Sequence, residues 1–184
     1  MTEDTPTSTP PSFSVSCETT KGSLKFLFTK TWSPLGYDRL YDLFSEGFYD
    51  NQYMYRVVPR FLVQFGVPNL SLDPALRKKY NFKNSIKDDP PTHRSFERGA
   101  VSFAGSGPNS RVADLFISYT HNAGLGNSPW EVPVGYVTQG MEVVESFQSY
   151  GDISAFNPKG PNQNKLRNRG KAYVKEEVRL GQGA

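Results

Sequence analysis

Alternation of apolar and polar side chains predicts a β-strand near the start of the chain. Leu24, Phe26 and Phe28 alternate with Lys25 and Leu27, so one face of this segment is apolar and the other is mixed. A two-residue period is typical of a strand that is buried on one face.

A helix is predicted next, because four apolar residues recur at positions i, i+3, i+4 and i+7 and form one helix face. These residues are Tyr37, Leu40, Tyr41 and Phe44. Ser33 and Pro34 precede them as N-cap and first-turn residues. Gly47 follows and is placed to end the helix.

Further strand-like runs lie in the middle of the chain. Two of them flank Pro59, and others cover residues 100–104, 115–119 and 132–137. Residues 67–97 are polar and lack a sustained period, so we expect a long loop that carries short elements.

The C-terminal third predicts one more helix and one more strand. Residues 141–150 have Val143, Val144 and Phe147 on an inward face, and Gly151 follows as a helix end. Residues 172–180 predict a last strand. There is no internal repeat.

Length and composition favour a single β-rich domain. The chain has 184 residues, including 13 Phe, 10 Tyr, 16 Gly and 14 Pro. This length is typical of one domain, and the composition suits a turn-rich β fold better than a helical bundle. We expect the domain to cover residues 13–184, after a disordered lead-in over residues 1–12 that is rich in Thr, Pro and Ser.

Charge and cysteine content limit the function class. The net charge of +3 is too small to predict nucleic-acid binding by itself. No apolar run approaches the roughly 18 residues of a membrane span, so we expect no association with nucleic acid or with a membrane. Cys17 is the single cysteine and can form no internal disulfide. Residues 1–12 contain no apolar leader, which favours a cytoplasmic location for the chain as given; a secretory location is the alternative if a leader was removed.

The run Y-M-Y-R-V-V-P-R-F-L-V-Q-F-G is the strongest functional signal in the sequence. Arg56 lies on one apolar strand, a turn follows, and Phe61, Leu62 and Gln64 lie on the next strand. A cation beside an apolar floor suits a ligand that is itself apolar but has one polarised bond.

This run resembles the signature of the cyclophilins, the peptidyl-prolyl cis–trans isomerases, in which an arginine, a phenylalanine and a glutamine occupy these spacings. A second segment, residues 98–116, supports the same family. The stretches I-K-D-D-P and N-P-K-G-P-N-Q-N-K-L are similar to those of a divergent cyclophilin-like subgroup that commonly lacks the family's pocket tryptophan and histidine.

The resemblance implies an all-β-dominated fold, a closed antiparallel cyclophilin-like β-barrel of about eight strands capped by two α-helices. The order of the predicted elements agrees with such a barrel. Closure would also remove exposed strand edges.

The resemblance also implies isomerisation of X–Pro bonds. Amide resonance sets a barrier of roughly 18–20 kcal/mol, whereas the cis and trans forms differ by only about 0.5–1 kcal/mol. A catalyst therefore needs to hold the proline and stabilise the twisted amide, without a metal, a cofactor or a covalent intermediate. By resemblance, Arg56 would be the catalytic arginine, Phe61 would line the proline pocket, and Gln64 would bind substrate and orient Arg56.

The same resemblance implies a set of substrate-binding residues: Leu62, Ala104, Gly105, Ser106, Asp114, Phe116 and Leu125. Leu62, Phe116 and Leu125 would complete the proline pocket. Ala104, Gly105 and Ser106 would pair with the substrate backbone.

Three positions depart from the family pattern. Asp114 replaces a glutamine, and Gly124 stands where many members have a tryptophan. Pro129, Glu131 or neither takes the place of the family's histidine. We therefore expect reduced or altered specificity and weak binding of cyclosporin.

The expected partners are proline-containing peptides or unfolded proteins, bound by a monomer that assists folding. The alternative is a weakly active or inactive proline-peptide binding module in a partner complex, motivated by the altered wall at residues 124–131.

Other motifs give weaker signals. Asp88 and Asp89 form a carboxylate pair, but a solvated turn is the favoured interpretation. Cys17, His93 and His121 lack metal-ligand spacing, so we expect no metal site. Two basic stretches, over residues 77–87 and 165–175, are interpreted as solvated segments rather than phosphate sites.

Overall fold

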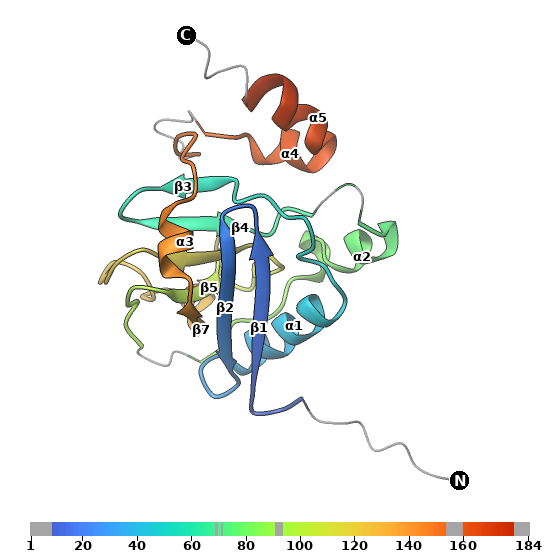
Figure 1. Ribbon diagram of the computed structural model, residues 1–184. Helices are drawn as coiled ribbons and strands as arrows, with labels where there is room; N and C mark the ends of the chain where they lie inside the picture. Colours follow the sequence, from blue (N-terminus) through green and yellow to red (C-terminus); the bar gives the residue numbers. More distant parts are fainter. Residues whose placement is uncertain (1–8, 69, 71, 91–93, 154–159, 179–184) are drawn as a thin grey trace.

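An antiparallel sheet of seven strands forms the centre of the molecule (Figure 1). The computed structural model describes residues 9–68, 70, 72–90, 94–153 and 160–178. Within these residues the strands are β1 (Ser12–Thr19), β2 (Gly22–Thr29), β3 (Arg56–Val58), β4 (Leu62–Phe65), β5 (Ala100–Phe103), β6 (Leu115–Ser118) and β7 (Pro133–Gln139). Their order across the sheet is β1-β2-β7-β5-β6-β4-β3.

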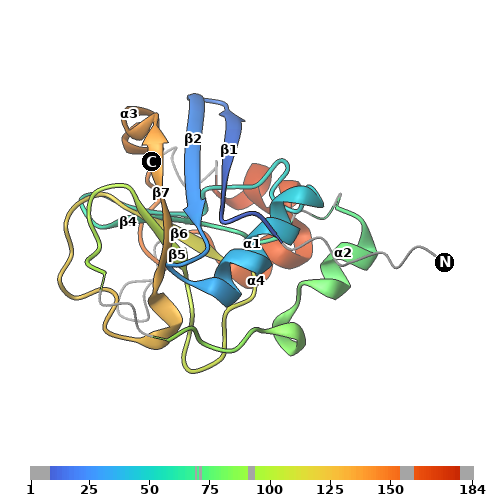
Figure 2. The same ribbon diagram turned by 90° about the horizontal axis from the view of Figure 1, so that it is seen from below.

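Short helices surround this sheet (Figures 1 and 2). The α-helices are α1 (Pro34–Ser45), α2 (Pro74–Lys79), α3 (Met141–Glu145), α4 (Gln163–Arg169) and α5 (Lys171–Tyr173). Two 3₁₀ helices, η1 (Phe82–Asn84) and η2 (Pro129–Glu131), and a π-helix, η3 (Val174–Val178), complete the described elements. None of the helices in the described ranges is long and apolar enough to cross a membrane.

Aromatic side chains join α1 to the sheet. Phe13 on β1 contacts Tyr37 and Tyr41 on α1 edge to face, and Phe28 on β2 lies 5.4 Å from Phe44, centroid to centroid. Such pairs add to the hydrophobic burial of both elements. The predicted apolar face of this helix is therefore the face that packs on the core.

Most of the predicted strands are confirmed. The alternation around Phe26 is β2, and the runs that flank Pro59 are β3 and β4. The three runs in the middle of the chain are β5, β6 and β7, within two residues at each end. The long segment before β5 carries α2 and η1, as expected of a loop with short elements.

The N-terminal segment contacts the core just before β1. The hydroxyl of Tyr37 donates to the carbonyl of Pro10 at 2.5 Å, and the backbone N–H of Lys30 donates to the carbonyl of Pro11 at 2.9 Å. Ser12 already belongs to β1, and residues 1–8 of the predicted lead-in lie outside the described residues.

The helix predicted over residues 141–150 is shorter than expected and ends at Glu145. Val144 is buried, as predicted. The chain then turns towards β3, where the hydroxyl of Ser149 donates to the carbonyl of Val57 at 2.6 Å. This contact carries the following residues to the strand that holds Arg56.

The last strand, predicted over residues 172–180, is wrong over its described part, because residues 171–178 are helical. The reason is burial at a helical spacing: Val174 and Val178, four residues apart, pack against the small cluster that contains Tyr173. Ion pairs from Arg169 to the two glutamates of η3 also favour the helical arrangement. Residues 179 and 180 lie outside the described residues.

Without that strand, the described sheet has β1 and β3 at its two ends. No pairing joins these two strands within the described ranges. The predicted antiparallel sheet is present, but its closure into a barrel of about eight strands is not confirmed.

The interpretation of the Asp88-Asp89 pair as a solvated turn is wrong for Asp89, which is buried. Asp89 is 2% exposed and accepts hydrogen bonds from the backbone N–H groups of Leu35 and Gly36, at 2.8 and 3.0 Å. It also accepts from the hydroxyl of Ser33 and forms an ion pair of 2.8 Å with Arg111. Ser33 is the N-cap by position, but the carboxylate of Asp89 satisfies the first N–H groups of α1.

Candidate active site

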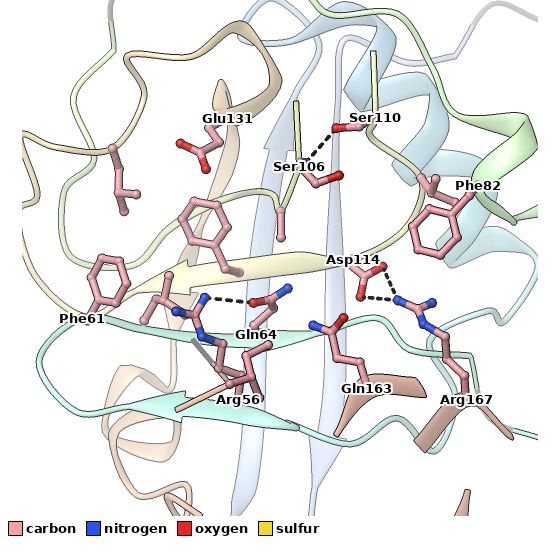
Figure 3. Close-up of a pocket in the computed structure, with 17 residues that line it drawn as sticks. Arg56, Phe61, Gln64, Phe82, Ser106, Ser110, Asp114, Glu131, Gln163 and Arg167 are labelled. Atoms are coloured by element: carbon pink, nitrogen blue, oxygen red, sulfur yellow. Dashed lines mark hydrogen bonds and ion pairs between the residues drawn. The ribbon is translucent and has the colours of Figure 1, made fainter. Parts of the chain in front are cut away.

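All ten residues predicted for the site line one open groove with a cavity volume of about 440 Å³ (Figure 3). They are Arg56, Phe61, Leu62, Gln64, Ala104, Gly105, Ser106, Asp114, Phe116 and Leu125. They come from β3, β4 and the turn between them, the segment after β5, the start of β6 and the residue before it, and the loop before η2, so the sheet brings distant segments to one place.

The β3–β4 hairpin sets the geometry of Arg56 and Gln64. The two residues are register partners in this antiparallel pair, so their side chains leave the same face of the sheet. The Nη1 of Arg56 donates to the Oε1 of Gln64 at 3.2 Å (Figure 3). The guanidinium carbon of Arg56 also lies 5.8 Å from the ring centroid of Phe61, within range of a cation–π contact.

A second partner holds the other side of the Arg56 guanidinium. Its Nε donates to Oδ1 of Asp152 at 2.7 Å, and the same oxygen accepts the backbone N–H of Ile153 at 2.7 Å. The side chains of Arg56 and Asp152 are only 19% and 29% exposed, so water screens this ion pair less than a surface pair. Sequence reasoning missed Asp152, because it lies 96 residues from Arg56 and no local pattern connects them.

Apolar side chains form one half of the groove. Leu62 and Phe116 belong to a buried cluster with Phe96, against which Phe61 and Leu125 pack while remaining partly exposed. The rings of Phe96 and Phe116 are stacked with their centroids 5.4 Å apart. This stacking fixes the floor on which Phe61 and Leu125 form the walls.

Residues 124–131, the segment that departs from the family pattern, pack against the end of the groove at Gly105. A Cβ atom on Gly105 would lie 2.7 Å from the side chain of Trp130, so Trp130 packs directly on Gly105 and a side chain there has no room. Glu131 lines the groove, whereas Pro129 does not. Of these two residues, Glu131 is thus the one that forms part of the groove wall.

Polar side chains form the other half of the groove (Figure 3). The Nη2 of Arg167 lies 3.3 Å from Oδ2 of Asp114, and its guanidinium carbon lies 4.9 Å from the ring centroid of Phe82. The hydroxyl of Tyr55 donates to Oδ1 of Asp114 at 3.0 Å and accepts from Gln163 at 3.2 Å. Asp114 is thus already engaged by two side chains.

Burial and the charge of Asp114 shift the pKa of a neighbouring group. The pKa of Tyr55 is raised well above its ordinary value, first by burial and then by the charge of Asp114 and the hydrogen bond to it. Tyr55 therefore stays protonated at neutral pH and acts as a donor to Asp114.

Arg167 and Gln163 were not predicted as site residues, although both line the groove. Arg167 falls in a basic stretch that was interpreted as solvated, and its position depends on α4. Asn162 caps this helix by accepting the backbone N–H of Lys165 at 3.0 Å, and Leu166 buries it against the body of the domain. Arg167 and Gln163 then line the groove.

No group of three or more His, Cys, Asp or Glu side chains in the described ranges is placed to hold a metal ion. His93, one of the residues considered for metal binding, lies outside those ranges.

The chain belongs to the family of cyclophilin-type peptidyl-prolyl cis–trans isomerases. The family model, described as cyclophilin type peptidyl-prolyl cis-trans isomerase/CLD, matches residues 14–168. This match covers most of the chain and includes the hairpin with Arg56 and the groove residues before α5.

Curated relatives agree with this assignment. The peptidyl-prolyl cis-trans isomerase-like 3 of Dictyostelium discoideum is 28% identical over 133 residues, which are 72% of this chain and 80% of the relative. The peptidyl-prolyl cis-trans isomerase B of Bacillus subtilis is 32% identical over 111 residues, which are 60% of this chain and 72% of the relative.

Solved structures show the same fold. A cyclophilin type peptidyl-prolyl cis-trans isomerase of Cryptosporidium parvum matches with a TM-score of 0.58 at 22% identity, over 79% of this chain and 89% of that chain. A second structure of that protein, determined in the presence of the dipeptide Ala-Pro, matches with the same TM-score. At this identity the likeness establishes the fold.

Proposed function

We propose that the protein catalyses cis–trans isomerisation of X–Pro bonds in peptides or unfolded proteins and so assists their folding. The observation that carries this proposal is the arrangement of Arg56. Two of its nitrogens are held by Asp152 and Gln64, while Nη2 has no hydrogen-bond partner among the described residues. A fixed guanidinium with a free donor thus lines a groove whose adjacent half is apolar.

The proposed catalysis uses the apolar side chains of the groove to bind proline and the guanidinium of Arg56 to stabilise the twisted amide. The proline ring would bind between Phe61, Phe116 and Leu125, which exclude water from it. When the amide twists, its nitrogen regains a lone pair, and a donor from Arg56 stabilises that charge only at the top of the barrier. No bond to the enzyme forms, and the site residues keep their protonation states.

Backbone groups at the end of β5 offer a place for the peptide chain. The N–H of Ala104 donates to the carbonyl of Asp114 at 2.8 Å, and the N–H of Ser106 donates to the hydroxyl of Ser110 at 2.8 Å. Gly105 lies between them and makes no hydrogen bond to any described residue. We therefore assign backbone pairing with the substrate chiefly to Gly105.

Two narrower proposals concern cyclosporin binding and the oligomeric state. Gly124 does not line the groove, so no aromatic side chain is supplied from that position, and we expect cyclosporin to bind weakly. We also expect the protein to act as a monomer, since the groove is complete within one chain.

Exchange spectroscopy by NMR tests the proposed activity. A short X–Pro peptide with resolved cis and trans signals is mixed with a catalytic amount of protein, and the interconversion rate is measured. The isomerase predicts faster exchange without a change in the cis/trans ratio. Shifts or line broadening of the peptide without faster exchange would contradict the proposal and favour a binding module.

A further inference from the structure

We propose that Glu131 makes the groove selective for X–Pro peptides that carry a cationic side chain, Lys or Arg, next to the proline. This proposal rests on the proposed isomerase function and concerns which substrates the same groove accepts. Its basis is the balance of charged groups around the groove and the burial of one of them.

Each cation in the groove already has a carboxylate partner. Arg56 is paired with Asp152 at 2.7 Å, and Arg167 is paired with Asp114 at 3.3 Å. Glu131 is the remaining charged side chain of the lining, and its carboxylate makes no hydrogen bond or ion pair with any described residue. The groove and its immediate partners therefore carry two positive and three negative groups when all are ionised.

The backbone at Glu131 is held by its neighbours. Proline opens η2 at Pro129, and the N–H of Glu131 donates to the carbonyl of Ser128 at 2.9 Å. Trp130 packs on Gly105, so the next side chain along η2 is held at the groove (Figure 3). Because this backbone is already ordered, a ligand that binds Glu131 does not have to order the segment first.

Partial burial makes this carboxylate more receptive to a cation. Removal from water disfavours the ionised form, and burial raises the pKa of Glu131 above its ordinary value. A cationic side chain of the substrate compensates the ionised carboxylate for its lost hydration. Water screens this ion pair less than it screens a pair at the surface. A neutral side chain of the same length offers no such compensation, and an acidic one adds repulsion.

The test compares matched peptides in the NMR exchange assay. Lysine is placed either before or after the proline, and norleucine, which has a similar length without the charge, replaces it in the control peptides. We expect the kcat/KM for lysine to exceed that for norleucine by about fivefold in at least one position, the upper range of a partly exposed ion pair. The Glu131→Gln variant should reduce this ratio to near one.

A charge-matched variant is the control. Glu142→Gln removes one carboxylate from an exposed position on α3 that does not line the groove, and it should leave the ratio as in the wild type. Equal rates for lysine and norleucine peptides in the wild type would overturn the proposal, as would a ratio that persists in Glu131→Gln. Absence of acceleration for every peptide would instead refute the isomerase function itself.

Discussion

At the scale of the residue, the orientation of Arg56 depends on Asp152, a carboxylate that does not line the groove. Asp152 lowers the net charge near Arg56, which weakens its field in the groove, but it also fixes the Nε side of the fork. A mobile arginine loses rotamer freedom each time it engages substrate. We infer that the gain in orientation outweighs the loss of charge, because a group held close to its working geometry avoids that loss during the reaction.

Substitution of Asp152 tests this positioning role. Asp152→Ala should lower kcat/KM for an X–Pro peptide about tenfold, because Arg56 is released on its Nε side. Asp152→Asn keeps an oxygen acceptor for the Nε–H and should lower it by less than about threefold. The nitrogen and proton shifts of the Arg56 Nε–H group, measured by NMR, should move strongly in the alanine variant and less in the asparagine variant.

Two results would contradict a positioning role for Asp152. One is an alanine variant as active as the wild type. The other is an asparagine variant as impaired as the alanine variant, since charge and not the hydrogen bond would then be the important property.

At the scale of the element, the start of α1 depends on a buried ion pair. Asp89 satisfies the backbone N–H groups of Leu35 and Gly36 and neutralises Arg111, which is 1% exposed. Burial by itself raises the pKa of Asp89, but the hydrogen bonds from Ser33, Arg111 and the two N–H groups outweigh burial and hold it below its ordinary value. The ionised form is thus the one that stabilises the fold.

Asp89→Asn should lower the free energy of unfolding by about 3 kcal/mol, because it removes the nearer carboxylate of the buried Arg111 and leaves only Asp88, at 3.8 Å. Urea unfolding measures this loss. Asp38→Asn is the matched control: Asp38 lies on α1 itself, and its side chain is 45% exposed in its ion pair with Lys30. The control should lose less than about 1 kcal/mol.

The same ion pair predicts how stability depends on pH. Because the folded pKa of Asp89 is lowered, its contribution is present above the pKa of the unfolded chain and is lost as the pH falls through the folded pKa. The wild type should therefore lose stability more steeply in acid than Asp89→Asn. Equal acid profiles, or equal losses in the Asp89 and Asp38 variants, would contradict this account of α1.

At the scale of the whole molecule, the fold brings the ten predicted residues together by strand pairing. Arg56 and Gln64 were predictable because a short hairpin keeps both on one face of the sheet. Phe116 joins them because β6 pairs with β4, and it is the register partner of Gln64. Local periodicity and family spacing therefore located the apolar half of the groove and its arginine.

The polar half was not predictable from local pattern. Arg167 enters the groove through α4, which depends on burial of Leu166 and Tyr173 far from the sheet's sequence signals. The segment after it was predicted as a strand but its described part is helical, because packing and ion pairs with Arg169 decide its conformation. Asp89 was misjudged for a similar reason, since its partner Arg111 lies 22 residues away.

The proposed role of Arg56 is tested most directly by exchange spectroscopy on wild type, Arg56→Ala and Arg56→Lys, with the fold of each variant checked by its amide spectrum. We predict that wild type accelerates X–Pro exchange and that Arg56→Ala, while folded, loses about 100-fold in kcat/KM, the cost of removing one preorganised donor from a transition state. Arg56→Lys should recover little, because a lysine keeps the charge but not the fork that Asp152 and Gln64 hold. A folded Arg56→Ala variant that accelerates exchange as well as wild type would contradict the account.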